Sequence, residues 1–576
     1  MHAPLLAPPS RQEILTMLRT RFSHRRFRPG QEEVLQALLT GRDVLAVLPT
    51  GAGKSLVFQI ASQLLPGITI VVSPLLALMH DQEESLAERG VEVAVINSTR
   101  SDSQIAEELA RVQQGEARLL YVTPERLLSE AFLHELRALP VSLLAVDEAH
   151  CVSEWGHSFR PAYLALGAAV RQLGSPTVLA LTATATPWVR RDIVEQLGMC
   201  DPEVIVRGSD RPNIFFGVQR VESEVDEFRA VRRLLAPAEY DGGQPPVHDE
   251  VQAACFAGAG IIYTATTRAA RETAEWLQAW GISADYYHGQ RAKRDRVRVQ
   301  DAFMAGDLRV VAATNAFGLG IDKPDVRFVL HRDIPASLEA YYQEAGRAGR
   351  DGEPSYAVLL YRPADLGRAA FLSGGSRLDR EDIAAVCSVL VEHGELAPRR
   401  LAALTKLPQP TLLRVIAALE AEEIVGRRRG RLRLLQPTCD ADAVSLEAEE
   451  RRRAYDVSRL SMMRGYAESV SCRREYILNY FGEAYDPSEC QRCDTSLTLR
   501  LAPRPTEDGP FSVGQPVRHE TWGEGIVQRA TGDSVTVLFD AVGFKTFDLA
   551  LVQERGLLEP SDTAPFPSGG RLETAT

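Results

Sequence analysis

The sequence predicts an α/β protein with two doubly wound parallel sheets in tandem, followed by three smaller modules. Up to about Val206, short runs rich in leucine and β-branched residues alternate with longer helical patterns, and a second such series follows "SDRPNIFF" and ends near residue 368. Strands that alternate with helices form parallel sheets, whose functional loops lie at the carboxyl ends of the strands. The length of 576 residues leaves room for about four domains.

Composition narrows the class of protein. A hydrophobic fraction of 45% and a charged fraction of 25% are ordinary for a soluble globular chain. No apolar run approaches the roughly 18 residues of a membrane span and the first residues do not resemble a signal peptide, so we expect no membrane contact and a cytoplasmic location. Five of the eight cysteines stand singly, which predicts a reducing compartment without a disulfide framework. The net charge of −12 does not exclude a polyanionic partner, because a local basic groove can bind phosphates.

Changes in pattern along the chain set the expected boundaries. The Gly- and Pro-rich stretch from Ala236 to Ala254 is expected to be an exposed irregular insertion in the second sheet domain. Beyond residue 376, three helical patterns and a basic hairpin predict a winged helix, and an alternating segment near the C-terminus predicts a small SH3/Tudor-like barrel. The expected units are 1–206 and 207–368 (the two sheet domains), 376–437 (winged helix), 447–497 (helical module with a cysteine cluster), 498–510 (linker), 511–560 (barrel) and 561–576 (disordered tail).

A phosphate-binding loop follows the first predicted strand. "LPTGAGKS", from Leu48 to Ser55, includes Gly51 and Gly53, and Leu48 replaces the first glycine of the usual pattern. Such a loop wraps backbone amides around phosphates; Lys54 would reach the β and γ oxygens, and the Ser55 hydroxyl can bind Mg2+. Lys54 is one of only five lysines among 65 basic residues, and its compact charge would not be replaced well by a guanidinium.

Two acids close a later strand in "VDEAH". Asp147 and Glu148 would face the same phosphates from the end of that strand. Phosphoryl transfer needs one acid to hold Mg2+ and another to orient or deprotonate the attacking water. The alternative is a pair of acids that caps a helix.

These segments are part of an ordered series of motifs over about residues 10 to 365. The motifs are "FRPGQEEVL", "LPTGAGKS", "VVSPLLALMHDQ", "YVTPERL", "VDEAHCVSEWGHSFRP", "ALTATAT", "IIYTATTR", "ATNAFGLGIDKPDVRFVLH" and "YYQEAGRAGRDG". The series resembles the motifs of the RecQ family of DNA helicases. The resemblance implies two RecA-like domains and ATP-driven unwinding of DNA in the 3′ to 5′ direction, in repair or recombination. Residue patterns alone indicate only a two-domain nucleotide hydrolase.

The resemblance assigns roles to nucleotide-contacting residues. Gln31 would read the adenine edge and Arg28 would pack on its face, with His24 where the family usually has an aromatic residue. His150 and the stretch Thr182–Thr184 would link the state of the nucleotide to the neighbouring domain.

The second domain would complete the site. Arg347 and Arg350 fall where such helicases keep arginine fingers, which stabilise charge on the transferring phosphoryl group, and Gln343 would help to position the nucleotide. The alternative for the two arginines is solvated surface.

Aromatic residues directly after the acids point to DNA. Trp155 and Phe159, with His157 and Arg160, would form the loop that couples DNA binding to hydrolysis, because aromatic rings stack on unpaired bases without demanding sequence. The alternative is that both aromatics fill the domain core. Glu154 and Ser158 depart from the commonest form of this loop.

The smaller modules carry a basic hairpin and a metal-type cluster. The hairpin arginines 427, 428, 429, 431 and 433 would contact DNA phosphates or form a solvated face. Cys472, Cys490 and Cys493 have the spacing of zinc ligands, but the family's fourth cysteine is Ser496 here. Either another donor, such as Asp494 or a histidine, completes a Zn2+ site, or the module folds without metal.

The predicted partners are DNA with a single-stranded tail or a branched duplex and, through the barrel, a protein. The barrel is similar to the tails of UvrD/PcrA-type helicases, which meet RNA polymerase or other partners, although it could equally add only stability or a weak nucleic-acid contact. Two alternatives to a DNA helicase are an RNA-directed helicase of the same superfamily and a nucleotide-gated scaffold that does not unwind.

Overall fold

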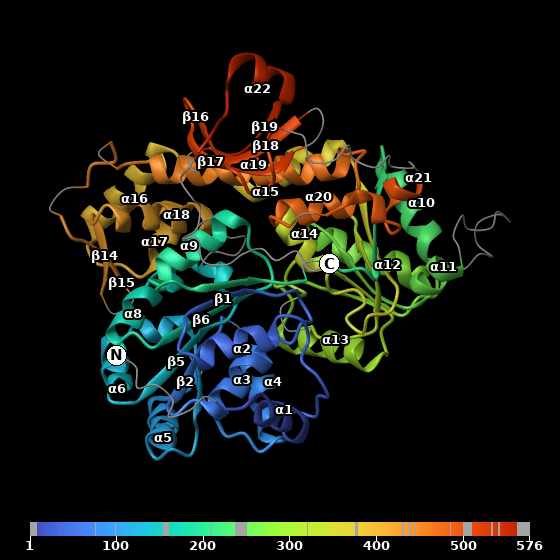
Figure 1. The fold of residues 1–576 in the computed structure, drawn as a ribbon. Coiled ribbons are helices and arrows are strands. Elements are labelled where there is room, and N and C mark those ends of the chain that lie inside the picture. Colours follow the sequence, from blue (N-terminus) through green and yellow to red (C-terminus); the bar gives the residue numbers. More distant parts are fainter. Residues whose placement is uncertain are drawn as a thin grey trace.

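Two parallel sheets organise most of the computed structural model (Figure 1). It describes residues 9–561 except 75, 98–99, 154–159, 209, 237–249, 319–320, 375–377, 429–430, 437–438, 443, 484, 499–509, 531–533 and 540–541. Within the part of the chain that is described, no helix combines the length and apolar character needed to span a membrane.

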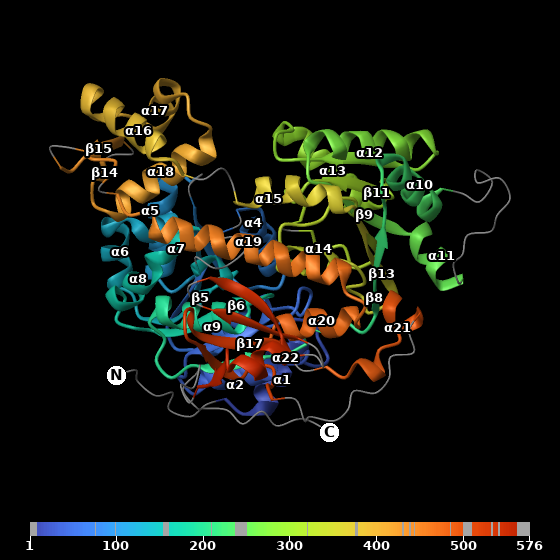
Figure 2. The same ribbon diagram turned by 90° about the horizontal axis from the view of Figure 1, so that it is seen from above.

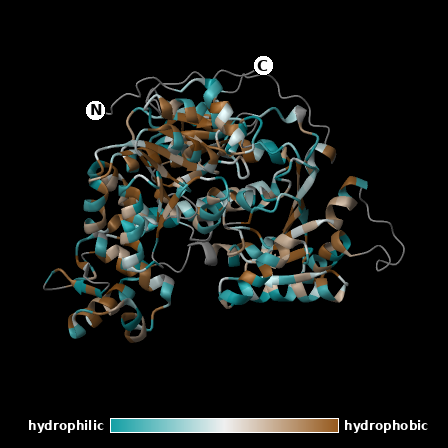
Figure 3. Ribbon diagram, turned by 90° about the horizontal axis from the view of Figure 1, so that it is seen from below, coloured by the Kyte–Doolittle hydropathy of each residue, from teal (hydrophilic) through white to brown (hydrophobic). Residues whose placement is uncertain are grey.

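The first sheet has seven parallel strands in the order β3-β4-β2-β5-β6-β1-β7. Most of its strand residues are buried, because helices cover both faces, and this is why these strands are continuous apolar runs in the sequence (Figure 3). The strands are β1 (Val44–Val47), β2 (Ile68–Val72), β3 (Val93–Ile96), β4 (Leu119–Val122), β5 (Val141–Val146), β6 (Thr177–Thr182) and β7 (Glu203–Val206). The helices are α1 (Arg11–Thr20), α2 (Gln31–Leu39), α3 (Ser55–Leu64), α4 (Leu76–Ala87), α5 (Asp102–Gln113), η1 (Pro124–Leu128), α6 (Glu130–Arg137), η2 (Ala149–Val152), α7 (Pro161–Leu164), α8 (Leu166–Gln172) and α9 (Pro187–Leu197).

The second sheet has six parallel strands in the order β10-β11-β9-β12-β13-β8. The expectation of irregular chain up to Ala254 is wrong from Glu250 onward, where α11 begins and buries Cys255 and Phe256. The strands are β8 (Ile214–Arg220), β9 (Ala259–Tyr263), β10 (Ala284–Tyr287), β11 (Val310–Ala313), β12 (Val326–His331) and β13 (Ser355–Tyr361). The helices are α10 (Glu224–Leu235), α11 (Glu250–Ala257), α12 (Thr267–Ala279), α13 (Lys293–Ala305), α14 (Leu338–Ala345), η4 (Pro363–Asp365) and α15 (Leu366–Gly374).

A helical unit with its own core is inserted between α15 and α19 (Glu447–Glu468), two helices that pack against each other (Figure 2). It consists of α16 (Arg380–His393), α17 (Pro398–Thr405), α18 (Gln409–Ala421) and the hairpin of β14 (Val425–Arg428) and β15 (Arg431–Leu434). A disulfide joins Cys387 to Cys439 in this unit. The expectation that these two cysteines stand singly is therefore wrong.

The C-terminal sheet, residues 516–560, has five antiparallel strands and packs on α19 and α20 (Arg473–Tyr480). Its Phe544 ring lies with its centroid 5.1 Å from that of Tyr480 and 6.1 Å from that of Tyr455, so it is buried in the core that continues into the second sheet. The remaining elements are η5 (Pro487–Glu489), α21 (Asp494–Thr498), β16 (Pro516–His519), β17 (Gly523–Ala530), β18 (Ser534–Phe539), β19 (Gly543–Asp548), α22 (Leu549–Arg555) and β20 (Glu559–Pro560).

Candidate active site

The loop from Leu48 to Ser55 lies between β1 and α3, as the sequence predicts. Gly51 and Gly53 have φ of +82° and +70°, backbone that residues with a side chain rarely adopt, so the tight loop requires glycine there. The Lys54 Nζ donates to the Leu48 carbonyl at 3.3 Å. Burial lowers the pKa of Lys54, and the carboxylates of Glu148 and Asp147 oppose that shift. The lysine therefore lies close enough to both acids for their charges to favour its protonated form.

Gln31 ties helix α2 to this loop. Its side-chain amide donates to the carbonyls of Ala52 at 2.8 Å and Gly53 at 2.9 Å, and its Oε1 accepts from the backbone N–H of Arg28 at 2.9 Å. The Arg28 guanidinium donates to the Gly51 carbonyl. A surface hollow lies beside these contacts, and its lining includes His24, Phe27, Arg28 and Gly30. Of the three residues predicted to contact adenine, His24 and Arg28 line this hollow, whereas Gln31 is buried beside it against the loop.

Asp147 and Glu148 lie at the carboxyl end of β5. Asp147 is 7% exposed, and burial, followed by the charge of Glu148, raises its pKa to about 7, while Lys54 opposes the rise. Glu148 has a φ of +49°, and its side chain makes no cap bond to η2. The helix-capping alternative therefore does not describe this pair.

His150 connects the acids to the end of β6. Its Nδ1 lies 3.3 Å from Glu148 Oε2 and 3.0 Å from Thr182 Oγ1. The Thr182 hydroxyl in turn donates to the Thr184 carbonyl at 3.1 Å. A chain of polar contacts thus leads from the acids toward α9.

Two arginines of the second domain follow α14, the helix that carries Gln343. The Arg347 side chain is buried and donates to the Gly318 carbonyl. Arg350 forms an ion pair with Asp322. The sequence does not predict a role for Asp322, although this residue lies in the "GIDKPD" part of a helicase motif. A Cβ placed on Gly51 would lie 3.4 Å from Arg350 Cγ, so Arg350 packs on the loop of the first domain. The solvated-surface alternative is therefore wrong for both arginines.

The predicted DNA-coupling loop lies largely outside the described residues, which exclude Trp155, His157 and Phe159. Arg160 is described, and its backbone N–H donates to the Cys151 carbonyl at 3.2 Å, while its guanidinium donates to the Pro74 carbonyl at 3.2 Å. Arg160 is thus held at η2, the short helix that begins directly after Glu148.

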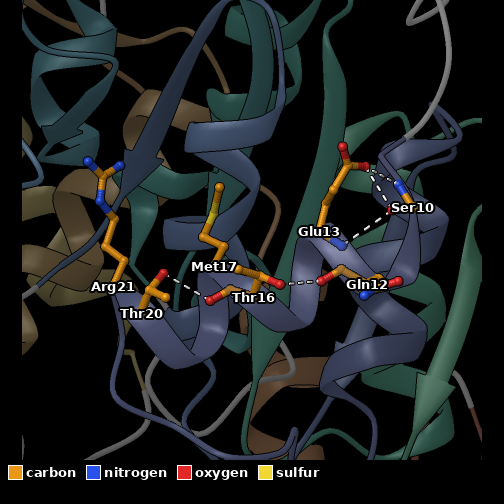
Figure 4. Close-up of a pocket in the computed structure, with 7 residues that line it drawn as sticks. All are labelled: Ser10, Gln12, Glu13, Thr16, Met17, Thr20 and Arg21. Carbon is orange, nitrogen blue, oxygen red and sulfur yellow. Dashed lines mark hydrogen bonds between the residues drawn. The ribbon is translucent and has the colours of Figure 1, made fainter.

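A separate hollow along α1 contains none of the predicted site residues (Figure 4). It is lined by Ser10, Gln12, Glu13, Thr16, Met17, Thr20 and Arg21. Ser10 and Glu13 form the capping box that begins α1, so their polar groups serve the helix.

Comparison with known proteins identifies the family. Residues 28–192 match the DEAD/DEAH box helicase family, 253–352 the helicase conserved C-terminal domain and 432–497 the RecQ zinc-binding domain. The chain is 35% identical over 490 residues to a probable ATP-dependent DNA helicase RecS of Bacillus subtilis, covering 83% of this chain and 91% of the relative. The chain belongs to the RecQ family of DNA helicases.

A RecQ of a Synechocystis species is 34% identical over 507 residues, covering 85% of this chain and 99% of that protein. The alignment with RecQ of Pasteurella multocida covers only 63% of that longer protein. Among solved structures, the helicase MrfA bound to DNA has a TM-score of 0.50 at 16% identity, covering 77% of this chain and 61% of that one, which shows a shared fold.

The cysteines of the RecQ zinc-binding segment come together. The Sγ of Cys493 lies 3.7 Å from that of Cys490 and 3.9 Å from that of Cys472. Sulfurs that surround zinc as a tetrahedron lie about 3.8 Å apart, so the three thiols fit three ligand positions. The Oγ of Ser496, the position predicted for a fourth ligand, lies 3.2 Å from Cys493 Sγ.

The alternative fourth donors are not supported among the described residues, where no further His, Cys, Asp or Glu joins the three thiols. Asp494 is engaged elsewhere. Its Oδ1 pairs with Arg473 Nε at 3.0 Å, and its Oδ2 accepts from the backbone N–H of Val218 at 3.0 Å. The described part of the chain therefore offers three thiols and, beside them, the Ser496 hydroxyl.

Proposed function

We propose that this RecQ-family chain hydrolyses ATP with Mg2+ to unwind duplex DNA in the 3′ to 5′ direction, in DNA repair or recombination. The observation that supports it most is the approach of Arg350 to Gly51, because it brings a cation of the second domain to the phosphate-binding loop of the first. A site divided between two domains can convert hydrolysis into movement of one domain against the other.

The residue roles follow from this arrangement. Gly51, Gly53 and Lys54 would hold the phosphates, and Arg347 and Arg350 would stabilise charge that develops on the transferring phosphoryl group. Arg28 and Gln31 would position the adenine from the hollow beside them, and Gln343 would help from the second domain. Because the Gln31 amide donates to loop carbonyls, a shift of the loop on nucleotide binding would also shift the start of α2.

The acids would divide the remaining work. Ser55 and Asp147 would hold Mg2+, which would supply positive charge to stabilise the phosphates when bound. Glu148 would take the proton of the attacking water and thereby lose its negative charge. This loss would change the interaction of Glu148 with His150, whose Nδ1 lies 3.3 Å from Glu148 Oε2. Thr182 and Thr184 would carry that change to α9.

DNA would be gripped next to the acids. Trp155, His157 and Phe159 would stack on unpaired bases, and Arg160, anchored at the Pro74 carbonyl, would hold the loop's end in place. We interpret the unit of α16–α18 and its hairpin as a winged helix that adds contacts to DNA phosphates, and the C-terminal sheet as an SH3/Tudor-like barrel that binds a protein partner such as RNA polymerase.

Zinc is part of the proposal. Cys472, Cys490 and Cys493 would hold Zn2+ with the fourth position taken by the Ser496 hydroxyl or a water, a weaker donor than a thiolate. Bound zinc would join α20 to the segment before α21.

Strand displacement tests the function. Duplexes with a 3′ or a 5′ single-stranded tail are incubated with ATP and the wild type, Lys54→Ala, or the matched control Lys293→Ala at an exposed position of α13. We expect displacement from the 3′-tailed duplex alone, lost in Lys54→Ala and kept in Lys293→Ala. Equal displacement by Lys54→Ala and the wild type would overturn the assignment, and stronger stimulation of ATP hydrolysis by RNA than by DNA of the same sequence would favour an RNA-directed enzyme.

A further inference from the structure

Helix α20 and the turn after it contact the helix that leads into the finger arginines. All eight residues of α20 are buried. The Tyr480 hydroxyl donates to Glu339 Oε1 at 2.6 Å, and the Phe481 ring lies with its centroid 5.1 Å from that of Tyr342. Glu339 and Tyr342 both belong to α14, which ends at Ala345, two residues before Arg347.

The same turn contacts the first domain through α9. The Arg190 guanidinium donates to the Phe481 carbonyl, and its Nε donates to the Ala185 carbonyl at 3.0 Å. Gly482 has a φ of +77°, and a Cβ there would lie 2.8 Å from Pro187 Cγ. The turn is therefore pressed against the start of α9, and only glycine fits.

Arg190 is a buried cation, 7% exposed. Burial lowers its pKa to about 10, and the charge of Glu483, in the same turn as Phe481, opposes that shift. A buried guanidinium is tolerated only where acceptors and an opposite charge compensate its loss of water. Both forms of compensation come in part from this turn, so Arg190 holds the turn and the turn stabilises Arg190.

Helix α20 also holds the chain that joins the two sheets. Arg474 forms an ion pair with Asp210 and donates to the Ile214 carbonyl at 2.9 Å. Arg211, next to Asp210, donates to the carbonyls of Gly346 and Ala348 at 2.7 Å each, on both sides of Arg347. The helix with its following turn thus contacts the first domain, the connection and α14, and the connection in turn contacts the residues on both sides of Arg347 through Arg211.

We propose that α20 with the turn Phe481–Glu483 is a strut that sets the position of Arg350 over the phosphate-binding loop, and that Arg190 is the positioning residue by which the first domain engages this strut. The inference rests on the proposed ATP hydrolysis. Ala185, the second acceptor of Arg190, directly follows Thr184, so the strut meets the first domain at the end of the polar chain that starts at Glu148. If protonation of the acids drives domain closure, the closing movement would therefore act on the contact between Arg190 and the turn.

Steady-state ATP hydrolysis with saturating single-stranded DNA tests the strut. The variants are Arg190→Gln, which removes the charge, Arg190→Lys, which keeps it, and the control Arg191→Gln. Arg191 neighbours Arg190 but lies over the Trp188 ring at 3.7 Å and pairs with Glu195 on the same helix.

We expect kcat to fall about tenfold in Arg190→Gln, the scale of one charge-assisted hydrogen bond that is used in the transition state. The KM for ATP and the Kd for ADP should change by less than about twofold. The groups of the first domain that bind the nucleotide equally in its ground and transition states are unchanged. Arg190→Lys should recover part of the lost kcat. A purely structural role would lower stability and the active fraction, so kcat is calculated per active site from a titration of ADP-binding sites; a structural role would leave this kcat unchanged.

A distance measurement gives an independent readout. Dyes at Cys200, which is exposed beyond α9, and at Val297→Cys on α13 report the separation of the two domains by fluorescence transfer. We expect a broader distance distribution in Arg190→Gln, and also in Glu483→Gln, which serves if Arg190→Gln does not fold. A kcat for Arg190→Gln equal to that of Arg191→Gln would overturn the strut, whereas a wild type without ATP hydrolysis would overturn the proposed function itself.

Discussion

Neutralising Asp147 should stabilise the protein, increasingly so as the pH rises toward neutral. Burial and Glu148 raise the pKa of Asp147 from its ordinary 3.8 to about 7, so the folded chain binds this proton more tightly than the unfolded chain does. The ionised carboxylate therefore opposes folding. A tenfold difference in proton affinity corresponds to about 1.36 kcal/mol, so a pKa near 7 in place of 3.8 means a penalty of about 2–4 kcal/mol, which falls on the pair of Asp147 and Glu148.

The pH dependence identifies the cause. The penalty is absent below about pH 3, where Asp147 is protonated in both states, and is complete above about pH 7. The free energy of unfolding in urea, without Mg2+ or nucleotide, should be higher for Asp147→Asn than for the wild type, by about 1 kcal/mol at pH 5 and by about 2–4 kcal/mol at pH 8. Asp301→Asn, at an exposed position of α13, should show no such trend. A difference that is constant between pH 5 and pH 8 would refute the reasoning.

Three further changes test the modules behind the two sheets. Ser496→Cys should raise zinc affinity at least about tenfold in chelator competition, because a thiolate completes the cysteine set; unchanged affinity would contradict a ligand position there. Gly482→Ala should lower the free energy of unfolding by about 2–3 kcal/mol, since φ is +77° and Pro187 blocks the added methyl group, and wild-type stability would argue against that packing. Phe544→Ala should cost about 3–5 kcal/mol and expose the C-terminal sheet to limited proteolysis; resistance equal to the wild type would mean that the Tyr480 contact does not hold the sheet.

Local patterns predicted the parts of the fold that local physics determines. Strands buried on both faces of a parallel sheet are apolar throughout, so β1, β2 and β5 are visible as short hydrophobic runs. The glycines of the phosphate-binding loop are required by their own backbone angles, and this is why that motif could be placed from sequence. Helix α11 was missed because the prolines and glycines directly before it dominated the pattern.

Contacts between distant segments had no sequence signal. Arg190 and Phe481 are 291 positions apart, and nothing near either residue indicates the other. The pairing of Cys387 with Cys439 spans 52 positions and depends on the packing of the inserted helical unit. The approach of Arg350 to Gly51 also depends on how two domains are placed, which motif spacing does not contain.

The central claim is that Arg350 of the second domain completes an ATP-hydrolysing site in a DNA helicase. The most direct test measures DNA-stimulated ATP hydrolysis and displacement of a 3′-tailed strand by Arg350→Ala, with Arg298→Ala, which removes an exposed partner of Asp285, as control. We expect Arg350→Ala to keep ADP binding and to lose about a thousandfold in kcat together with strand displacement, while the control retains both activities. Hydrolysis and displacement by Arg350→Ala at the control's rates would contradict the account.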